Sequence, residues 1–224
     1  MKQLKRVLLL MVLMVTVSMG ASITLKAAIG VAAWDAMSQS VSYLTGAKIG
    51  TIGMLFNSLC VLGQILVLGK QYKWIQLLQL PLNILLGTLI NFFLYDVLGS
   101  VTIDSYLVNL LILLVSLVFM SIVVSAVMVL DMVTFALEGF CLAVAKVTKT
   151  EFSKVRQGMD ILSVVIVLIL TFSFSLPLSL REGTIIGMIF FAPLMGFFMG
   201  KLRPIFKRLD LLEEVPVGKV EMEV

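Results

Sequence analysis

The chain contains the stretch SYLVNLLILLVSLVFMSIVVSAVMVL, residues 105–130, in which no side chain carries a charge. A helix of about 20 apolar residues is enough to cross the ~30 Å hydrocarbon core of a bilayer. This stretch is too long and too apolar for a core helix of a soluble domain. It therefore predicts a transmembrane helix.

Five further charge-free windows of similar length lie on either side of this stretch. They are Val7 to Leu25, Ile49 to Gly69, Trp74 to Tyr95, Ile161 to Leu180 and Gly183 to Gly200. Only Arg181 and Glu182 separate the last two, which predicts a tight hairpin there. We therefore expect an all-α, polytopic membrane helix bundle with six transmembrane helices.

The composition also points to a lipid environment. Of the 224 residues, 60% are hydrophobic and 13% are charged, whereas charged residues make up about a quarter of an ordinary soluble domain. The length suits one bundle without a second soluble domain. We expect a single transmembrane domain over residues 1–204 and a short cytoplasmic tail over residues 205–224.

The distribution of lysine and arginine predicts the orientation. If the N-terminus is cytoplasmic, only Lys26, Lys48 and Arg181 lie on the outer side, as the positive-inside rule requires. We therefore expect both termini in the cytoplasm. Residues 1–21 also resemble a secretory signal peptide, but their apolar run is longer than the usual ~7–15 residues, so we interpret it as the first transmembrane helix.

Several classes of function are disfavoured by the residues that the chain lacks. It has no histidine, so neither a Ser-His-Asp nor a Cys-His arrangement can form. Cys60 and Cys141 do not have the number or spacing of a zinc site or a disulfide framework. No phosphate-binding loop is present, and the basic residues flank apolar spans. We expect no enzymatic activity, catalytic residue, metal or cofactor, and no nucleic acid partner.

A moderately polar segment, Val31 to Gly46, follows the first span and suggests an internal repeat. Its polar residues Asp35, Ser38, Ser42 and Thr45 share one helical face. The same spacing recurs at an offset of 96 residues (131 minus 35), in Asp131, Thr134, Glu138 and Cys141. Half-repeats 1–98 and 105–204 with three spans each would be inverted, with short interfacial or re-entrant helices. The alternative is chance, because similar polar faces occur on any interfacial helix.

Ionisable residues near hydrocarbon are costly and usually face a partner or a cavity. Asp35 and Lys26 can neutralise each other, or both can reach the membrane interface with Trp34 as an anchor. Arg156 and Asp160 lie four residues apart, which favours an ion pair within one helix, and Asp131 can join them.

Polar side chains also follow one face of two spans. The third span carries Gln76, Gln79, Asn83, Gly87 and Asn91 at steps of three or four residues, and the second carries Asn57 and Gln64. These stripes indicate either a cavity lining or hydrogen bonds between helices. The resulting candidate substrate site near the midplane comprises Trp34, Asp35, Ser38, Asn57, Asn83, Asn91, Asp131, Arg156 and Asp160.

The run AIGVAAWDAMS, residues 28–38, is followed by Thr45-Gly46, Ile49-Gly50 and Asn57. This pattern resembles the YczE/YitT-type bacterial integral membrane proteins, and it is closer to the short YczE-like branch than to YitT. Residues 183–187 resemble a small-residue motif of that family. The resemblance implies a bacterial inner-membrane protein of unsettled activity, with YczE-like members associated with the production of peptide or polyketide antibiotics.

The leading hypothesis is a transporter-like protein that moves a small solute or ion by alternating access. One alternative is a non-transporting scaffold or regulator of a partner protein, and another is the substrate-binding subunit of a multi-component importer. The expected partners are the lipid bilayer, a small-molecule or ion substrate, and a protein partner or a second copy of the chain.

Overall fold

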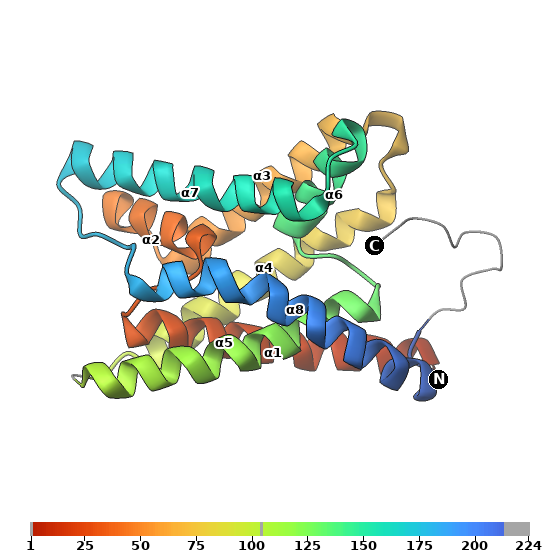
Figure 1. Ribbon diagram of the computed structural model, residues 1–224, viewed down its shortest axis with the longest axis horizontal. Helices are drawn as coiled ribbons and strands as arrows, with labels where there is room; N and C mark the ends of the chain where they lie inside the picture. The colour runs from red at the N-terminus through yellow and green to blue at the C-terminus, as the bar shows by residue number, and fades with distance from the viewer. Residues whose placement is uncertain (1, 104, 213–224) are drawn as a thin grey trace.

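The computed structural model describes residues 2–103 and 105–212, and all regular structure in these residues is helical (Figure 1). The α-helices are α1 (Lys2–Ala27), α2 (Ala33–Thr45), α3 (Ile49–Leu68), α4 (Gln79–Asn91), α5 (Tyr106–Leu130), α6 (Ala136–Thr148), α7 (Phe152–Phe174) and α8 (Glu182–Arg208). Short 3₁₀ turns precede α4, and a π-helical turn, η3 (Phe92–Val97), follows it.

Six helical segments of the described chain are long and apolar enough to cross a membrane. They are Lys2–Ala27, Ile49–Gln71, Trp74–Val97, Tyr106–Leu130, Phe152–Phe174 and Glu182–Arg208. The predicted all-α bundle with six transmembrane helices is confirmed. The protein is an integral membrane protein, and its exposed leucine, isoleucine and phenylalanine side chains face lipid.

The fifth span differs most from its predicted bounds. Helix α7 begins at Phe152 rather than at Ile161, so Arg156 and Asp160 lie inside the helix. The charge-free window missed residues 152–160 because they include Lys154, Arg156 and Asp160. Arg156 and Asp160 pair with each other within the helix. A linker of residues 175–181, which begins with Ser175 at a positive φ of 52°, joins α7 to α8.

The last helix also continues further than expected. Helix α8 runs to Arg208, past the boundary predicted at residue 204, and it includes Pro193 and Pro204. Most of the predicted cytoplasmic tail, residues 213–224, lies outside the described residues.

The helices form two layers (Figure 1). One layer contains α2, α3, α6 and α7, in which α2 packs on α7 and α6 packs on α3. The other contains α1, α4, α5 and α8, in which α5 packs between α1 and α8. Helices α3 and α4 join the layers closely, because a Cβ atom added to Gly50 would lie 2.2 Å from the backbone oxygen of Gly87. Helices α7 and α8 barely touch.

The two halves of the chain share their helix bounds at one offset. Helices α2 and α6 are both 13 residues long, and their first residues, Ala33 and Ala136, are 103 positions apart (136 minus 33). The starts of α3 and α7, Ile49 and Phe152, have the same offset. So do Ala28 and Asp131, which have positive φ angles of 54° and 48°.

The offset of 96 residues expected from the polar spacing is therefore wrong. Asp131 and Thr134 lie in the linker before α6 rather than on a helix, so they cannot share a face with Glu138. At an offset of 103, the residue equivalent to Asp35 is Glu138, and each is the third residue of its short helix.

The short helices lie at opposite ends of the bundle (Figure 1). Helix α6 lies at the end where α1 begins, which we call the N-terminal end, and α2 lies at the other, which we call the distal end. Asp35, in the first turn of α2, shares a cavity with Gly53 and Asn57, which lie about one and two turns into α3. The N-terminus of α2 therefore points into the bundle.

Candidate functional site

A cavity of about 60 Å³ lies between α1, α2, α3 and α4. Its walls include Trp34, Asp35 and Ser38 from the first turns of α2, and Gly53 and Asn57 from α3. The structure thus brings four of the sequence-derived candidates together: Trp34, Asp35, Ser38 and Asn57. The cavity has room for a few water molecules.

A larger hollow of about 400 Å³ lies at the distal end, and we call it the vestibule. It is lined by Gln39, Ser42 and Tyr43 of α2 and by Tyr95 of η3, with Lys26 at the end of α1. Leu25 and Ile49 line both the vestibule and the cavity. These two apolar side chains therefore separate the cavity from the distal end.

Three polar groups in the cavity wall have no hydrogen-bond partner within the described chain. The indole Nε1 of Trp34 is buried and unpaired, and no described residue hydrogen-bonds the Asp35 carboxylate or the Asn57 amide. Ser38 differs, because its hydroxyl donates to the Trp34 carbonyl at 3.2 Å. Unpaired polar groups are costly in an apolar medium. The wall thus presents both donors and acceptors to a small ligand.

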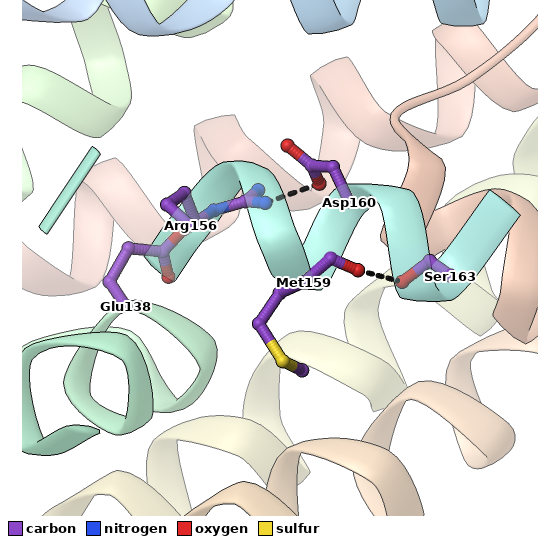
Figure 2. A network of polar contacts seen from close by, with 5 residues as sticks. All are labelled: Glu138, Arg156, Met159, Asp160 and Ser163. Atoms are coloured by element: carbon purple, nitrogen blue, oxygen red, sulfur yellow. Dashed lines mark hydrogen bonds and ion pairs between the residues drawn. The ribbon is translucent and has the colours of Figure 1, made fainter. Parts of the chain in front are cut away.

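A charged cluster lies beside this cavity, between α6 and α7. Figure 2 shows Arg156 directed along α7 toward Asp160, with Glu138 approaching from α6. The Arg156 Nε atom lies 3.6 Å from Glu138 Oε1, and its terminal nitrogen pairs with the Asp160 carboxylate. The predicted Arg156–Asp160 pair is confirmed. All three side chains are largely buried, with exposed fractions of 16%, 13% and 17% for Arg156, Glu138 and Asp160.

Asp35 belongs to the same electrostatic unit. Its carboxylate interacts electrostatically with Arg156, Glu138 and Asp160. The unit therefore combines three carboxyl groups with one guanidinium. Burying charge is favourable only when it is compensated, and one arginine cannot neutralise three carboxylates. When all four groups are ionised, the unit has a net negative charge that a further cation can compensate.

Lys26 does not supply that charge. The predicted Lys26–Asp35 pair does not form, because the Lys26 ammonium donates to the Gly99 carbonyl at 3.1 Å. The ammonium nitrogen of Lys48, another basic residue near the vestibule, lies 5.4 Å from the centre of the Tyr95 ring. Asp131, which we expected to join Arg156, lies in the linker after α5.

The polar stripes of the second and third spans serve mainly to join helices. Gln64 of α3 and Gln79 of α4 exchange side-chain hydrogen bonds of 2.8 and 3.2 Å, and Gln64 also donates to the Ala136 carbonyl at the start of α6. Gln76 accepts from Gln79. Of the predicted stripe residues, only Asn57 and Gly87 line the cavity.

The two remaining asparagine candidates lie outside the cavity wall. Asn91 accepts from the Gly50 backbone at 2.9 Å and so caps the first turn of α3, while its Nδ2 donates to Thr51. Asn83 is buried, and its Nδ2 has no partner in the described chain. Neither side chain belongs to the cavity lining.

Sequence reasoning missed Glu138 and Gly53 as site residues. Glu138 was noticed only as part of a spacing, because the offset of 96 aligned Asp35 with Asp131. Alignment of the two short polar segments on their first helical residues would have paired the acids. Gly53 carries no polar group, and its importance comes only from the space beside it, since no atom lies within 4 Å of an added Cβ.

The fold and the buried charged cluster define a polytopic membrane protein with a polar interior. The chain belongs to a family of unknown function, DUF6198, whose model matches residues 4–200. No curated protein matches the chain. No solved structure matches it either.

Proposed function

We propose that this protein is transporter-like and moves a small solute or ion across the membrane, with the cavity at Asp35 as its binding site. The observation that carries the proposal is the arrangement of two hollows in series. The vestibule lies at the distal end, and Leu25 and Ile49 line both the vestibule and a cavity with unpaired polar groups. Polar groups inside a membrane bundle usually mark a substrate or ion pathway.

Alternating access is the mechanism that the paired halves support. We propose that the halves form an inverted repeat, because three crossings in the first half make the second enter from the opposite side. The short helices α2 and α6 then carry equivalent acids, Asp35 and Glu138, toward the midplane from opposite ends. Helix N-termini directed at the midplane are a recurring feature of transporter sites.

Alternating access needs two states of the protein, and the unequal contacts between the two layers distinguish them. Helices α3 and α4 are closely packed, whereas their equivalents α7 and α8 are nearly apart. In an inverted repeat, exchange of these two arrangements opens the opposite end. The residues equivalent to Leu25 and Ile49 are Met128 and Phe152, and we propose that they separate the site from the N-terminal end in the other state.

The proposal includes a location and an orientation. The excess of lysine and arginine at the N-terminal end supports a cytoplasmic position for that end, so the vestibule opens outward. Together with the YczE-like resemblance, this supports a location in the bacterial inner membrane.

Transport is tested with the purified full-length chain in proteoliposomes. We expect uptake above that of empty liposomes for at least one solute in a panel of ions, amines, sugars and amino acids. Asp35→Asn should abolish that uptake, whereas Asp96→Asn, which removes an exposed carboxylate from η3, should leave it unchanged.

Uptake at background for the whole panel, with both variants correctly folded, would contradict transport. A stoichiometric protein captured by crosslinking would then favour the scaffold or regulator alternative, and a co-purified ATPase would favour the importer subunit.

A further inference from the structure

The two halves of the protein place different residues around their equivalent acids. In the second half, Glu138 of α6 faces Arg156 and Asp160 of α7. At the offset of 103 residues, the equivalent positions in the first half are Asp35, Gly53 and Asn57, and all three line the cavity. One half therefore holds a guanidinium next to its acid, and the other holds a cavity.

The cavity exists because glycine stands where the second half has arginine. No atom lies within 4 Å of a Cβ atom built on Gly53. Asn57 replaces the acid Asp160, so the first half offers one carboxylate and one amide oxygen where the second offers two carboxylates. An amide and a carboxylate are both suitable acceptors for a cation.

The net charge of Asp35, Glu138, Asp160 and Arg156 also favours a cation in the cavity. Asp35, Glu138 and Asp160 are opposed by Arg156 alone. Of the three carboxylates, Asp35 has neither a hydrogen bond nor an ion pair in the described chain, and it is the one that lines the cavity. A second positive charge placed there would compensate a buried carboxylate, whereas an anion would add to the excess.

Resting on the proposed transport function, we infer that the solute bound beside Asp35 is a small monovalent cation. It takes the position between Asp35 and Asn57 that corresponds to the Arg156 guanidinium between Glu138 and Asp160. A cavity of about 60 Å³ suits an ammonium or alkali-metal ion with part of its hydration shell, or methylammonium. Trp34 supplies an aromatic wall, and aromatic faces attract cations.

Cation binding is measured with Trp34 as an internal reporter. The chain has two tryptophans, and Trp74 is 74% exposed at the opposite end of α3 from Asp35. In detergent-solubilised full-length Trp74→Phe protein, ammonium, methylammonium, sodium and potassium chlorides are titrated against choline chloride at constant ionic strength. We expect a saturable change in Trp34 emission with at least one of these cations and none with tetramethylammonium, glutamate or phosphate.

Two substitutions assign the signal to this cavity. Asp35→Asn should weaken binding by about tenfold to a hundredfold, as expected for loss of a charged hydrogen-bond acceptor, while Asp96→Asn should leave it unchanged. Gly53→Arg should remove the cation response by placing a tethered guanidinium in the cavity. Gly53→Ala adds one methyl group without charge, so it should weaken the response less than Gly53→Arg does.

The unfolding temperature of Gly53→Arg shows whether a lost cation response comes from an occupied cavity or from an unfolded protein. If the guanidinium pairs with Asp35, Gly53→Arg should unfold at a temperature near that of Gly53→Ala, and adding Asp35→Asn should lower it. A folded protein whose Trp34 emission responds to none of the four cations, or responds equally to the anions, would overturn the inference.

Binding and transport fail in different ways. Saturable cation binding with no flux in proteoliposomes would retain the cation site and remove the transport function. Asp35-dependent uptake of a neutral or anionic solute, without cation binding, would retain transport and remove the cation.

Discussion

At the scale of single residues, Arg156 is the side chain on which the polar interior depends most. It contacts Glu138 and Asp160 and acts electrostatically on Asp35. Arg156→Gln would leave three carboxyl groups without a cation. Because removal of one partner from a buried ion pair typically costs about 3–5 kcal/mol, we expect a strong loss of thermal stability in detergent.

A second substitution provides the control for Arg156→Gln. Adding Glu138→Gln removes one uncompensated carboxylate, so the double variant should regain part of the lost stability. If Arg156→Gln unfolds at the temperature of the unsubstituted protein, the cluster is not compensated by its arginine.

Two glycines on α3 provide a second residue-scale prediction. Gly50→Ala should destabilise the protein, because the new Cβ would lie 2.2 Å from the Gly87 carbonyl oxygen, a backbone atom that cannot move away alone. Gly53→Ala meets nothing within 4 Å and should stabilise it by about 0.5–1 kcal/mol, as usual for glycine to alanine inside a helix. Thermal unfolding of both variants checks this, and equal effects of the two would contradict the close α3–α4 contact.

Sequence alone predicted some residues of the cavity wall and missed others for a physical reason. Trp34, Asp35 and Ser38 were recognisable because polar side chains in an apolar context are costly and therefore informative. Asn83 and Asn91 looked equivalent to Asn57, since all three lie on polar faces. Which asparagine faces the cavity depends on helix packing, and a single-helix pattern contains no such information.

At the scale of helices, the amide pair of Gln64 and Gln79 joins α3, α4 and α6. Gln79→Leu should cost about 1–3 kcal/mol, because it leaves the buried Gln64 amide short of a partner. Adding Gln64→Leu should cost less than the sum of the two single changes. Additive losses in thermal unfolding would show that the two side chains do not act as a pair.

Apolar windows predicted the number of membrane-spanning helices because lipid requires each span to be long and uncharged. The windows failed at α7, where paired charges lie inside the helix. The polar spacing failed at the repeat, where it gave an offset of 96 instead of 103. Helix starts align the halves better, because the turns that precede α2 and α6 are fixed by backbone geometry rather than by side-chain type.

At the scale of the whole molecule, two layers meet closely along α3 and α4 and loosely at α7 and α8. The alternating access that we propose requires two related halves in unequal arrangements. The vestibule and the cavity both lie in the half with the closely packed pair. Leu25 and Ile49 lie between the vestibule and the cavity in this state, so access from the distal end requires these two side chains to move.

The most direct test of the account is the reaction of a cysteine placed in the cavity. Ser38→Cys, in protein with Cys60→Ala and Cys141→Ala, should react from the distal face with a small cationic thiosulfonate about tenfold faster than with an anionic one, because a cavity with negative charge concentrates cations. Asp35→Asn should reduce that preference. No reaction from the distal face, or equal rates with the two reagents, would contradict an acidic cavity reached through the vestibule.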